Sequence, residues 1–292
     1  MHVVVTGASG LIGRALTSEL RKRGAAITGV SRTPVGPRHD GITWVPWDGL
    51  PDAVSGSQAV IHLAGAGVAD RRWTAKRKEE LRTSRIETSR RVVEAIQAAG
   101  EKPSVLISAS AVGFYGDRGE EVLNETSSQG EGFLAQLCAD WEAATEGAGV
   151  RTATFRIGLA MSTDGGFLKP QLLPFKLGLG GPIGRGEQFV PWIHVDDVVR
   201  MLLWATENNQ VEGVFNVCAP EPVRHKEFAR ALGRALSRLA VLPLPPAVFK
   251  LPLGEGASLM TMSTRTLPEH AQELGFEFEH PVLDAALADL LS

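Results

Sequence analysis

The chain has 292 residues, a formal net charge of −3, 43% hydrophobic and 22% charged residues, which is ordinary globular composition. It has no basic excess that would suit nucleic acid or an anionic membrane surface, and no apolar run long enough to span a bilayer. Its two cysteines, Cys138 and Cys218, are too few for a disulfide framework, and it enters a strand without a leader-like segment, so we expect a cytoplasmic protein.

The first strand and the turn after it are the most informative stretch. The β-branched run Val3–Thr6 predicts a buried strand, and the apolar spacing of Leu11–Arg23 predicts a helix. Gly7 lets the chain turn off the strand, Gly10 lets backbone N–H groups approach a pyrophosphate, and Gly13 lets the helix pack closely. The phosphates would lie at the helix N-terminus, where unpaired N–H groups favour an anion. This context predicts a dinucleotide site; the alternative is a tight turn that binds no ligand.

The end of the second predicted strand bears on which dinucleotide binds. Strand Ala26–Val30 is followed by Ser31 and Arg32, with Arg38 nearby, where an NAD site would have an Asp or Glu for the ribose 2′-hydroxyl. A guanidinium is a forked donor for phosphate, and no carboxylate lies there to repel one. We therefore expect NADP(H) rather than NAD(H); the alternative is that Arg32 is a solvated loop residue.

Two further strands precede the first long helix. Thr43–Val45 predicts a short strand, after which the carboxylate of Asp48 either accepts from the adenine amino group or ends a turn. Ala59–Leu63 predicts a buried strand, followed by small residues that begin with Ala64 and Gly65. Small residues at the carboxyl end of a strand leave room for a cofactor against the backbone.

Strand and helix patterns alternate through the first half of the chain. Helices are expected around Arg85–Ala98 and over 134–141, and strands over Val105–Ser108 and Thr152–Arg156. This alternation predicts an α/β fold with a doubly wound, Rossmann-like parallel sheet. The basic run 71–78 either closes over phosphates or substrate, or is a solvated helix face.

The second half has a different texture. Residues 165–186 are rich in glycine and proline, which predicts a loop-rich insertion. Strand character returns at Trp192–Asp197, before a helix over Val198–Thr206 with Asp196 as its N-cap and a strand over Val214–Val217.

These patterns divide the chain into two parts. Residues 1–164 and 190–218 are expected to form the dinucleotide-binding domain. Residues 165–189 and 219–292 are expected to form a smaller, mainly C-terminal lobe over the carboxyl edge of the strands, where substrate would bind.

Several segments together resemble the extended short-chain dehydrogenase/reductase superfamily. They are the glycine triplet, the small residues after the fourth strand, Ser108–Gly116, Arg156–Gly158 and His194–Asp197. The chain resembles more narrowly an atypical branch of nucleoside-diphosphate-sugar epimerase-like proteins, through Arg72–Thr74, Ser84–Ile86, Trp141–Glu142 and Gly178–Trp192. The tail from Pro222 to Phe278 resembles that branch's C-terminal domain of unknown function.

The resemblance implies hydride chemistry. In the superfamily a serine bonds the reacting oxygen, a tyrosine transfers the proton, and a lysine four residues later lowers the tyrosine's pKa and holds the nicotinamide ribose. Ser110 matches the serine, but Leu134 and Cys138 occupy the tyrosine and lysine positions. The usual acid and base are therefore missing, and Cys138 is expected to be a small packed hydrophobe.

Two other residues are candidates for proton transfer. Tyr115 is the single tyrosine and follows the serine-rich strand end, while His194 has an ordinary pKa of about 6.5. The alternative for His194 is a structural histidine bonded to a loop carbonyl. Ser110 either orients a substrate hydroxyl or carbonyl, or satisfies backbone groups at the strand end.

The resemblance also implies binding positions. Pyrophosphate contacts are expected at Ser9, Gly10, Leu11 and Ile12, and adenosine and ribose contacts at Leu63, Ala64 and Gly65. Arg156 and Gly158 would shape the strand end beneath the nicotinamide. Where the lobes meet, we expect substrate contacts from Arg185, Gln188 and Trp192, because an arginine beside a glycine-rich loop suits a phosphate or carboxylate.

Two functions fit these observations. One is an NADP(H)-dependent epimerase or oxidoreductase acting on a small polar substrate, such as a nucleotide sugar. The other is a non-catalytic NADP(H)-binding sensor or partner-binding protein, favoured by the missing tyrosine and lysine. We expect no metal and no nucleic-acid or membrane partner, and the sequence leaves the oligomeric state open.

Overall fold

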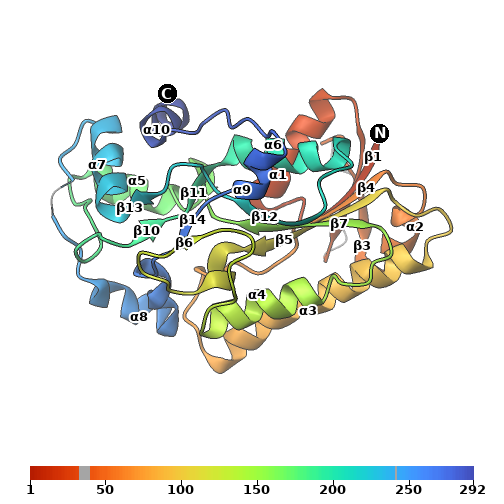
Figure 1. The fold of residues 1–292 in the computed structure, drawn as a ribbon, viewed down its shortest axis with the longest axis horizontal. Coiled ribbons are helices and arrows are strands. Elements are labelled where there is room, and N and C mark those ends of the chain that lie inside the picture. Colours follow the sequence, from red (N-terminus) through yellow and green to blue (C-terminus); the bar gives the residue numbers. More distant parts are fainter. Residues whose placement is uncertain (33–39, 241) are drawn as a thin grey trace.

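The computed structural model describes residues 1–32, 40–240 and 242–292, so Arg38 lies outside the described residues (Figure 1). Seven parallel strands form the main sheet, in the spatial order β12-β7-β5-β4-β1-β2-β3. Their bounds are β1 His2–Thr6, β2 Ala26–Ser31, β3 Thr43–Pro46, β4 Ala59–His62, β5 Val105–Ala111, β7 Arg151–Ile157 and β12 Gly213–Val217. The predicted doubly wound parallel sheet is confirmed.

Helices cover both faces of this sheet, as its buried central strands require. Helices α1 (Leu11–Lys22) and α6 (Val195–Glu207) pack together on one face, and α2 (Leu50–Val54), α3 (Ala75–Ala98) and α4 (Phe133–Ala143) cover the other (Figure 1). Helix α1 buries Leu16 and Leu20 along one stripe that faces the sheet. It ends with basic residues, whose charge suits the negative end of the helix dipole.

The strand order reverses at β1, and this reversal determines where a ligand can lie. The chain runs from β1 outward to β2 and β3, then returns to place β4 on the other side of β1. In open parallel sheets the crevice outside the carboxyl ends of the strands, at such a reversal, is where ligands bind.

A second hydrophobic core lies beside the sheet. It is built from Met161–Trp192 and Ala219–Leu291, with Trp192, Phe228 and Leu287 fully buried. Its helices are α5 Lys169–Lys176, α7 His225–Ala235 and α10 Leu283–Leu291, and the nearby strands are β8 Leu159–Ser162, β9 Gly165–Gly166, β10 Phe189–Val190, β11 Trp192–His194 and β13 Val223–Arg224. The remaining elements are β6 Val122–Leu123, β14 Arg265–Thr266, α8 Lys250–Leu253, α9 Glu269–Glu273 and the 3₁₀ turns η1 Trp47–Gly49, η2 Val112–Tyr115, η3 Pro246–Phe249 and η4 Glu255–Met260.

The predicted start of α6 was wrong by three residues. The helix begins at Val195, and its N-cap is His194 rather than Asp196. The ring Nδ1 of His194 accepts the backbone N–H of Asp196 at 3.1 Å, so a buried imidazole takes the capping role usually given to a carboxylate. Asp196 instead lies in the first turn, where its charge suits the helix dipole.

Across residues 1–32, 40–240 and 242–292, none of the helices combines the length and the apolar character needed to cross a bilayer.

Candidate functional site

A cleft of about 1060 Å³ opens at the carboxyl ends of β1, β2 and β4. It brings together eight of the residues expected to hold a dinucleotide: Gly7, Ser9, Gly10, Ser31, Arg32, Leu63, Ala64 and Gly65. Residues from α3, far away in the sequence, complete the wall: Lys76, Arg77, Glu79, Glu80, Thr83, Ser84, Glu87, Thr88 and Arg91.

The three glycines at the start of α1 meet different surroundings. Gly7 has φ +70°, and a Cβ there would lie 2.7 Å from the carbonyl carbon of Leu63. A Cβ on Gly13 would lie 2.2 Å from the carbonyl oxygen of Gly7. A Cβ on Gly10 would meet only that same oxygen, at 3.2 Å. Packing therefore requires Gly7 and Gly13, whereas Gly10 leaves backbone exposed to the cleft beside the unpaired N–H groups of the first helical turn.

A buried hydrogen-bond chain holds the β4 end of the cleft. Thr6 Oγ1 lies 2.6 Å from Nδ1 of His62, whose Nε2 lies 3.1 Å from Oγ of Ser89. The backbone N–H of Ala64 donates to Thr6 Oγ1 at 3.3 Å. Complete burial lowers the pKa of His62 to about 4, so its ring is neutral at pH 7 and acts as a fixed bridge between β1, β4 and α3.

The adenosine end has features that the sequence analysis missed. Trp44 and Trp47 line the cleft, and the Arg91 guanidinium lies 5.3 Å from the centre of the Trp47 ring. Arg91 also donates to Oδ1 of Asp48 at 2.8 Å. Asp48 points outward with its side chain 96% exposed and does not line the cleft, so its carboxylate is placed to neutralise Arg91 rather than to reach a ligand. The sequence places Trp47 next to Asp48, but its local pattern does not indicate that the Trp47 ring faces the cleft.

Leu11 and Ile12, although expected at the pyrophosphate, do not contribute side chains to the wall of the cleft. The Leu11 side chain lies against the glycines of β9, 3.4 Å from the position of a Cβ on Gly165. What these two residues offer a ligand is the backbone N–H at the first turn of α1.

A second group of predicted residues forms a closed polar network at the ends of β5 and β7. Ser110 Oγ donates to Oε1 of Glu142 at 2.6 Å. Arg156 donates two hydrogen bonds to the same carboxylate, at 2.9 and 2.8 Å. The Arg156 guanidinium lies 3.5 Å from the centre of the Phe114 ring and is absent from the cleft wall. Glu142, known from the sequence only as a landmark, is thus the centre of this network.

Tyr115 belongs to the same network and is fully buried. Its hydroxyl donates toward Oδ1 of Asn216 at 2.7 Å and the carbonyl of Asn124 at 2.9 Å, and accepts from Nη1 of Arg156 at 3.0 Å. Burial raises the pKa of Tyr115 to about 12. Its single proton is shared between two acceptors and the residue is fully buried, so the phenol is not exposed to a substrate.

His194 lies away from the cleft wall as well. Its ring stacks on His280 with 3.8 Å between centres, and its Nε2 lies 3.3 Å from Oδ2 of Asp289 in α10. Burial, together with His280, lowers the pKa of His194. Since Nδ1 accepts the N–H of Asp196, the ring proton is on Nε2, which lies near Asp289 but has no hydrogen-bond partner among the described residues. His194, Asp196, His280 and Asp289 bring four potential metal-ligand atoms within 4.8 Å of one another between the start of α6 and α10.

The expected substrate contacts lie in the second core and its border. Trp192 is 1% exposed, Gln188 Nε2 donates to the carbonyls of Ile183 and Met260, and Arg185 is exposed. None of them lines the cleft.

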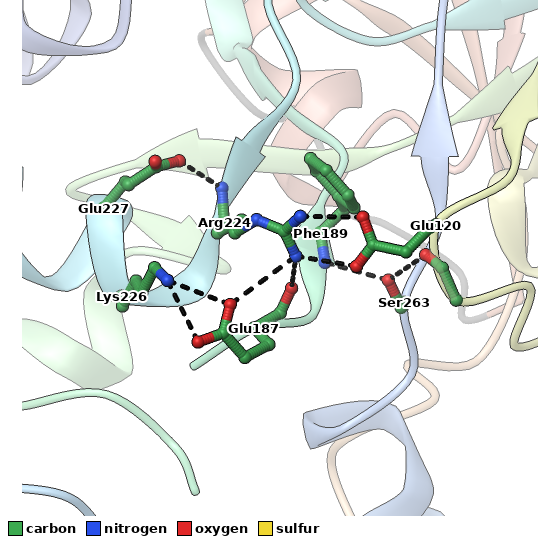
Figure 2. Close-up of polar contacts among 8 residues, drawn as sticks. Glu120, Glu187, Phe189, Arg224, Lys226, Glu227 and Ser263 are labelled. Atoms are coloured by element: carbon green, nitrogen blue, oxygen red, sulfur yellow. Dashed lines mark hydrogen bonds and ion pairs between the residues drawn. The ribbon is translucent and has the colours of Figure 1, made fainter. Parts of the chain in front are cut away.

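Figure 2 shows how the neighbouring segment is held. Arg224 of β13 donates to both carboxylate oxygens of Glu120 at 2.8 and 2.7 Å and to the carbonyl of Glu187 at 2.6 Å. The Phe189 N–H donates to Ser263 Oγ, and Lys226 pairs with Glu187. These contacts join the Glu120 loop, the 187–189 segment and the C-terminal part of the chain.

Residues 3–218 match the family described as "NAD dependent epimerase/dehydratase family", and residues 244–290 match "Domain of unknown function (DUF1731)". The chain is 39% identical over 302 residues to the Arabidopsis thaliana "Epimerase family protein SDR39U1 homolog, chloroplastic", covering 100% of this chain and 87% of the relative. It is 37% identical to the human epimerase family protein SDR39U1, covering 100% of both. The crystal structure of human SDR39U1 (isoform 2) with NADPH superposes with a TM-score of 0.93 at 36% identity, covering 100% and 99% of the two chains.

Proposed function

Because the chain belongs to the NAD-dependent epimerase/dehydratase family, we propose that it binds NADP(H) in the cleft beside α1 and β4 and acts on a small polar substrate, such as a nucleotide sugar, as an oxidoreductase or epimerase. The observation that carries the proposal is the contrast between Gly10, which faces the open cleft, and the tightly packed Gly7 and Gly13. A pyrophosphate would fit against Gly10 and the first turn of α1.

The choice of NADP(H) is supported at the end of β2. Arg32 is exposed and lines the cleft there, and a guanidinium suits the 2′-phosphate of the adenosine ribose. The human relative was crystallised with NADPH, which agrees with this proposal. Trp44 and Trp47 would supply apolar area for the adenine ring.

Ser110 is our candidate for the substrate-facing residue. NADP(H), when bound, supplies hydride transfer. The proton of Ser110 is directed to Glu142, so lone pairs of its oxygen are free to accept from a substrate hydroxyl. Arg156 in turn holds Glu142 with two hydrogen bonds, which fixes the direction in which Ser110 donates.

A second candidate function is a non-catalytic NADP(H) sensor. The engaged hydroxyl of Tyr115, together with Leu134 and Cys138 at the tyrosine and lysine positions, favours it. The two functions are separated by adding carbonyl compounds to the NADPH-bound protein, adding sugars and nucleotide sugars to the NADP+-bound protein, and analysing the sugars for epimers. NADPH consumed or formed stoichiometrically, or any epimer, eliminates the sensor, whereas unchanged coenzyme and sugars across a broad panel favour it.

Binding itself is tested with Gly10→Val, because the branched side chain would fill the path of the pyrophosphate. We expect NADPH binding to be abolished in fluorescence titration. The matched control is Gly100→Val, since a Cβ on Gly100 meets nothing within 4 Å. Retained binding by a folded Gly10→Val protein would contradict the assigned position of the coenzyme.

A further inference from the structure

Arg85 is a buried cation without a counter-charge. Its side chain extends from α3, and the residue is 8% exposed. Nη1 donates to the carbonyl of Leu81 at 3.3 Å and approaches Ser84 Oγ at 3.5 Å, both within the same helix. Across the described parts of the chain, no carboxylate pairs with it, whereas Arg77, two turns earlier, pairs with Glu80 at 3.0 Å. Burying an unpaired guanidinium is costly unless another group compensates for it.

The guanidinium does not line the cleft itself but lies directly behind Gly65, which does, at the β4 end. A Cβ on Gly65 would be 3.2 Å from Cζ of Arg85, so the missing side chain of Gly65 makes room for this cation behind the cleft wall. On its other side, Arg85 lies 4.9 Å from the centre of the Trp141 ring in α4, next to Cys138. Burial raises the pKa of the Cys138 thiol to about 12, so this neighbour is uncharged and does not neutralise Arg85.

The sheet order indicates which half of a dinucleotide would come near this point. The adenosine end is bounded by β2, with Ser31 and Arg32, and the pyrophosphate lies over the turn after β1. A dinucleotide crosses the sheet at the reversal of strand order, so its other half must lie over β4 and β5. Arg85 comes from the helix after β4 and contacts the helix after β5, and its neighbours Ser84 and Thr88 line the cleft.

We propose that Arg85 binds the nicotinamide half of the coenzyme, donating hydrogen bonds to the oxygen acceptors of the nicotinamide ribose. This proposal rests on the proposed binding of NADP(H) in the same cleft. The forked guanidinium has N–H groups that the protein leaves without acceptors, and ribose oxygens supply such acceptors. The superfamily's lysine, which holds the nicotinamide ribose, corresponds to Cys138 of α4. Arg85 of α3 would supply the cation in its place.

The test compares the whole coenzyme with its adenosine half. We expect Arg85→Met to weaken NADPH by about 10-fold or more, as loss of a charge-assisted hydrogen bond does, while binding of 2′,5′-ADP stays within about twofold of wild type. Because the variant also removes an unpaired buried charge, the ligand-free protein should be at least as heat-stable as wild type. Arg90→Met, on the exposed side of the same helix, should change neither ligand nor stability.

Other outcomes are equally decisive. Equal weakening of NADPH and 2′,5′-ADP, or no weakening of NADPH, overturns the proposal. If Arg85→Met unfolds at a lower temperature than wild type, the role is structural unless Arg85→Lys, which keeps the charge but not the fork, still weakens NADPH selectively. Failure of the proposed function itself looks different, because wild-type protein would then bind neither NADPH nor 2′,5′-ADP.

Discussion

The cleft at β1, β2 and β4 and the polar network at β5 and β7 lie along the same edge of one sheet but satisfy their polar groups differently. In the cleft, the backbone at Gly10 and the side chain of Arg32 face open space. In the network, Glu142, Arg156 and Tyr115 bond to one another at 2.8 to 3.0 Å.

This difference shows that position at a strand end does not by itself make a binding residue. The rule for parallel sheets identifies the edge where ligands bind, and every predicted site residue on the main sheet follows it. Whether such a residue can bind a ligand depends on whether other segments of the protein already occupy its hydrogen-bonding groups. Apart from the lone pairs of Ser110, the side chains of the network bond to one another or to nearby carbonyls, while the cleft leaves part of its set for a ligand.

The largest effect should come from breaking the network. Arg156→Met leaves the largely buried Glu142 without its partner, so we expect the free energy of unfolding to fall by about 3 to 5 kcal/mol. Denaturant titration measures this loss. NADPH affinity of the folded fraction should stay near wild type, because Arg156 does not line the cleft. A selective loss of affinity with unchanged stability would instead move Arg156 into the binding site.

The second largest effect is expected at low pH, where histidines that are neutral in the folded protein lower its stability. Burial lowers the pKa values of His62 and His225 to about 4, below an unfolded value of about 6.5. The unfolded chain then binds more protons than the folded one, so stability is full above pH 6.5 and falls as the pH approaches 4. These two protons contribute at most about 2.7 kcal/mol per pH unit to the slope.

The contribution of the cleft to this slope is separable. His62→Gln removes the titrating ring beneath the β4 end, so the slope measured by denaturation at several pH values should fall by up to about 1.4 kcal/mol per pH unit. An unchanged slope would show that His62 does not titrate between the folded and unfolded states as described.

The smallest effect is expected at the rim of the cleft. Arg32→Asp should weaken NADPH by about 10-fold more than NADH, since only NADPH carries the 2′-phosphate that the guanidinium would pair with. Calorimetry with both coenzymes measures the ratio, and NADH serves as the internal control. Equal weakening of the two would remove the assignment of the 2′-phosphate to Arg32.

Local patterns were sufficient for the fold and for the sheet edge at which the cleft opens. The β-branched run before Gly7, the glycine spacing and the strand–helix alternation each depend on neighbours in the sequence, and the structure has them where they were predicted. The prediction of Asp196 as the N-cap was wrong because the ring of the buried His194, which lies beside Asp289 of α10, caps the helix instead.

The presence of a residue type able to transfer protons did not predict whether its side chain can reach a ligand. Tyr115 and His194 were candidates because phenol and imidazole can move protons, yet the structure engages both inside the protein. Arg85 had no predicted role beyond a family landmark, because its significance depends on the carboxylate it lacks and on the space left by Gly65.

The amino-acid order alone determined the parallel sheet, the glycine turn before α1 and the lack of a lysine four residues after the single tyrosine, since these follow from periodicity, glycine spacing and residue identity. The tertiary structure alone decided which polar groups are consumed and which stay open. Burial and hydrogen-bond pairing are set by contacts between segments far apart in the chain, such as Ser110 with Glu142 or Gly65 with Arg85.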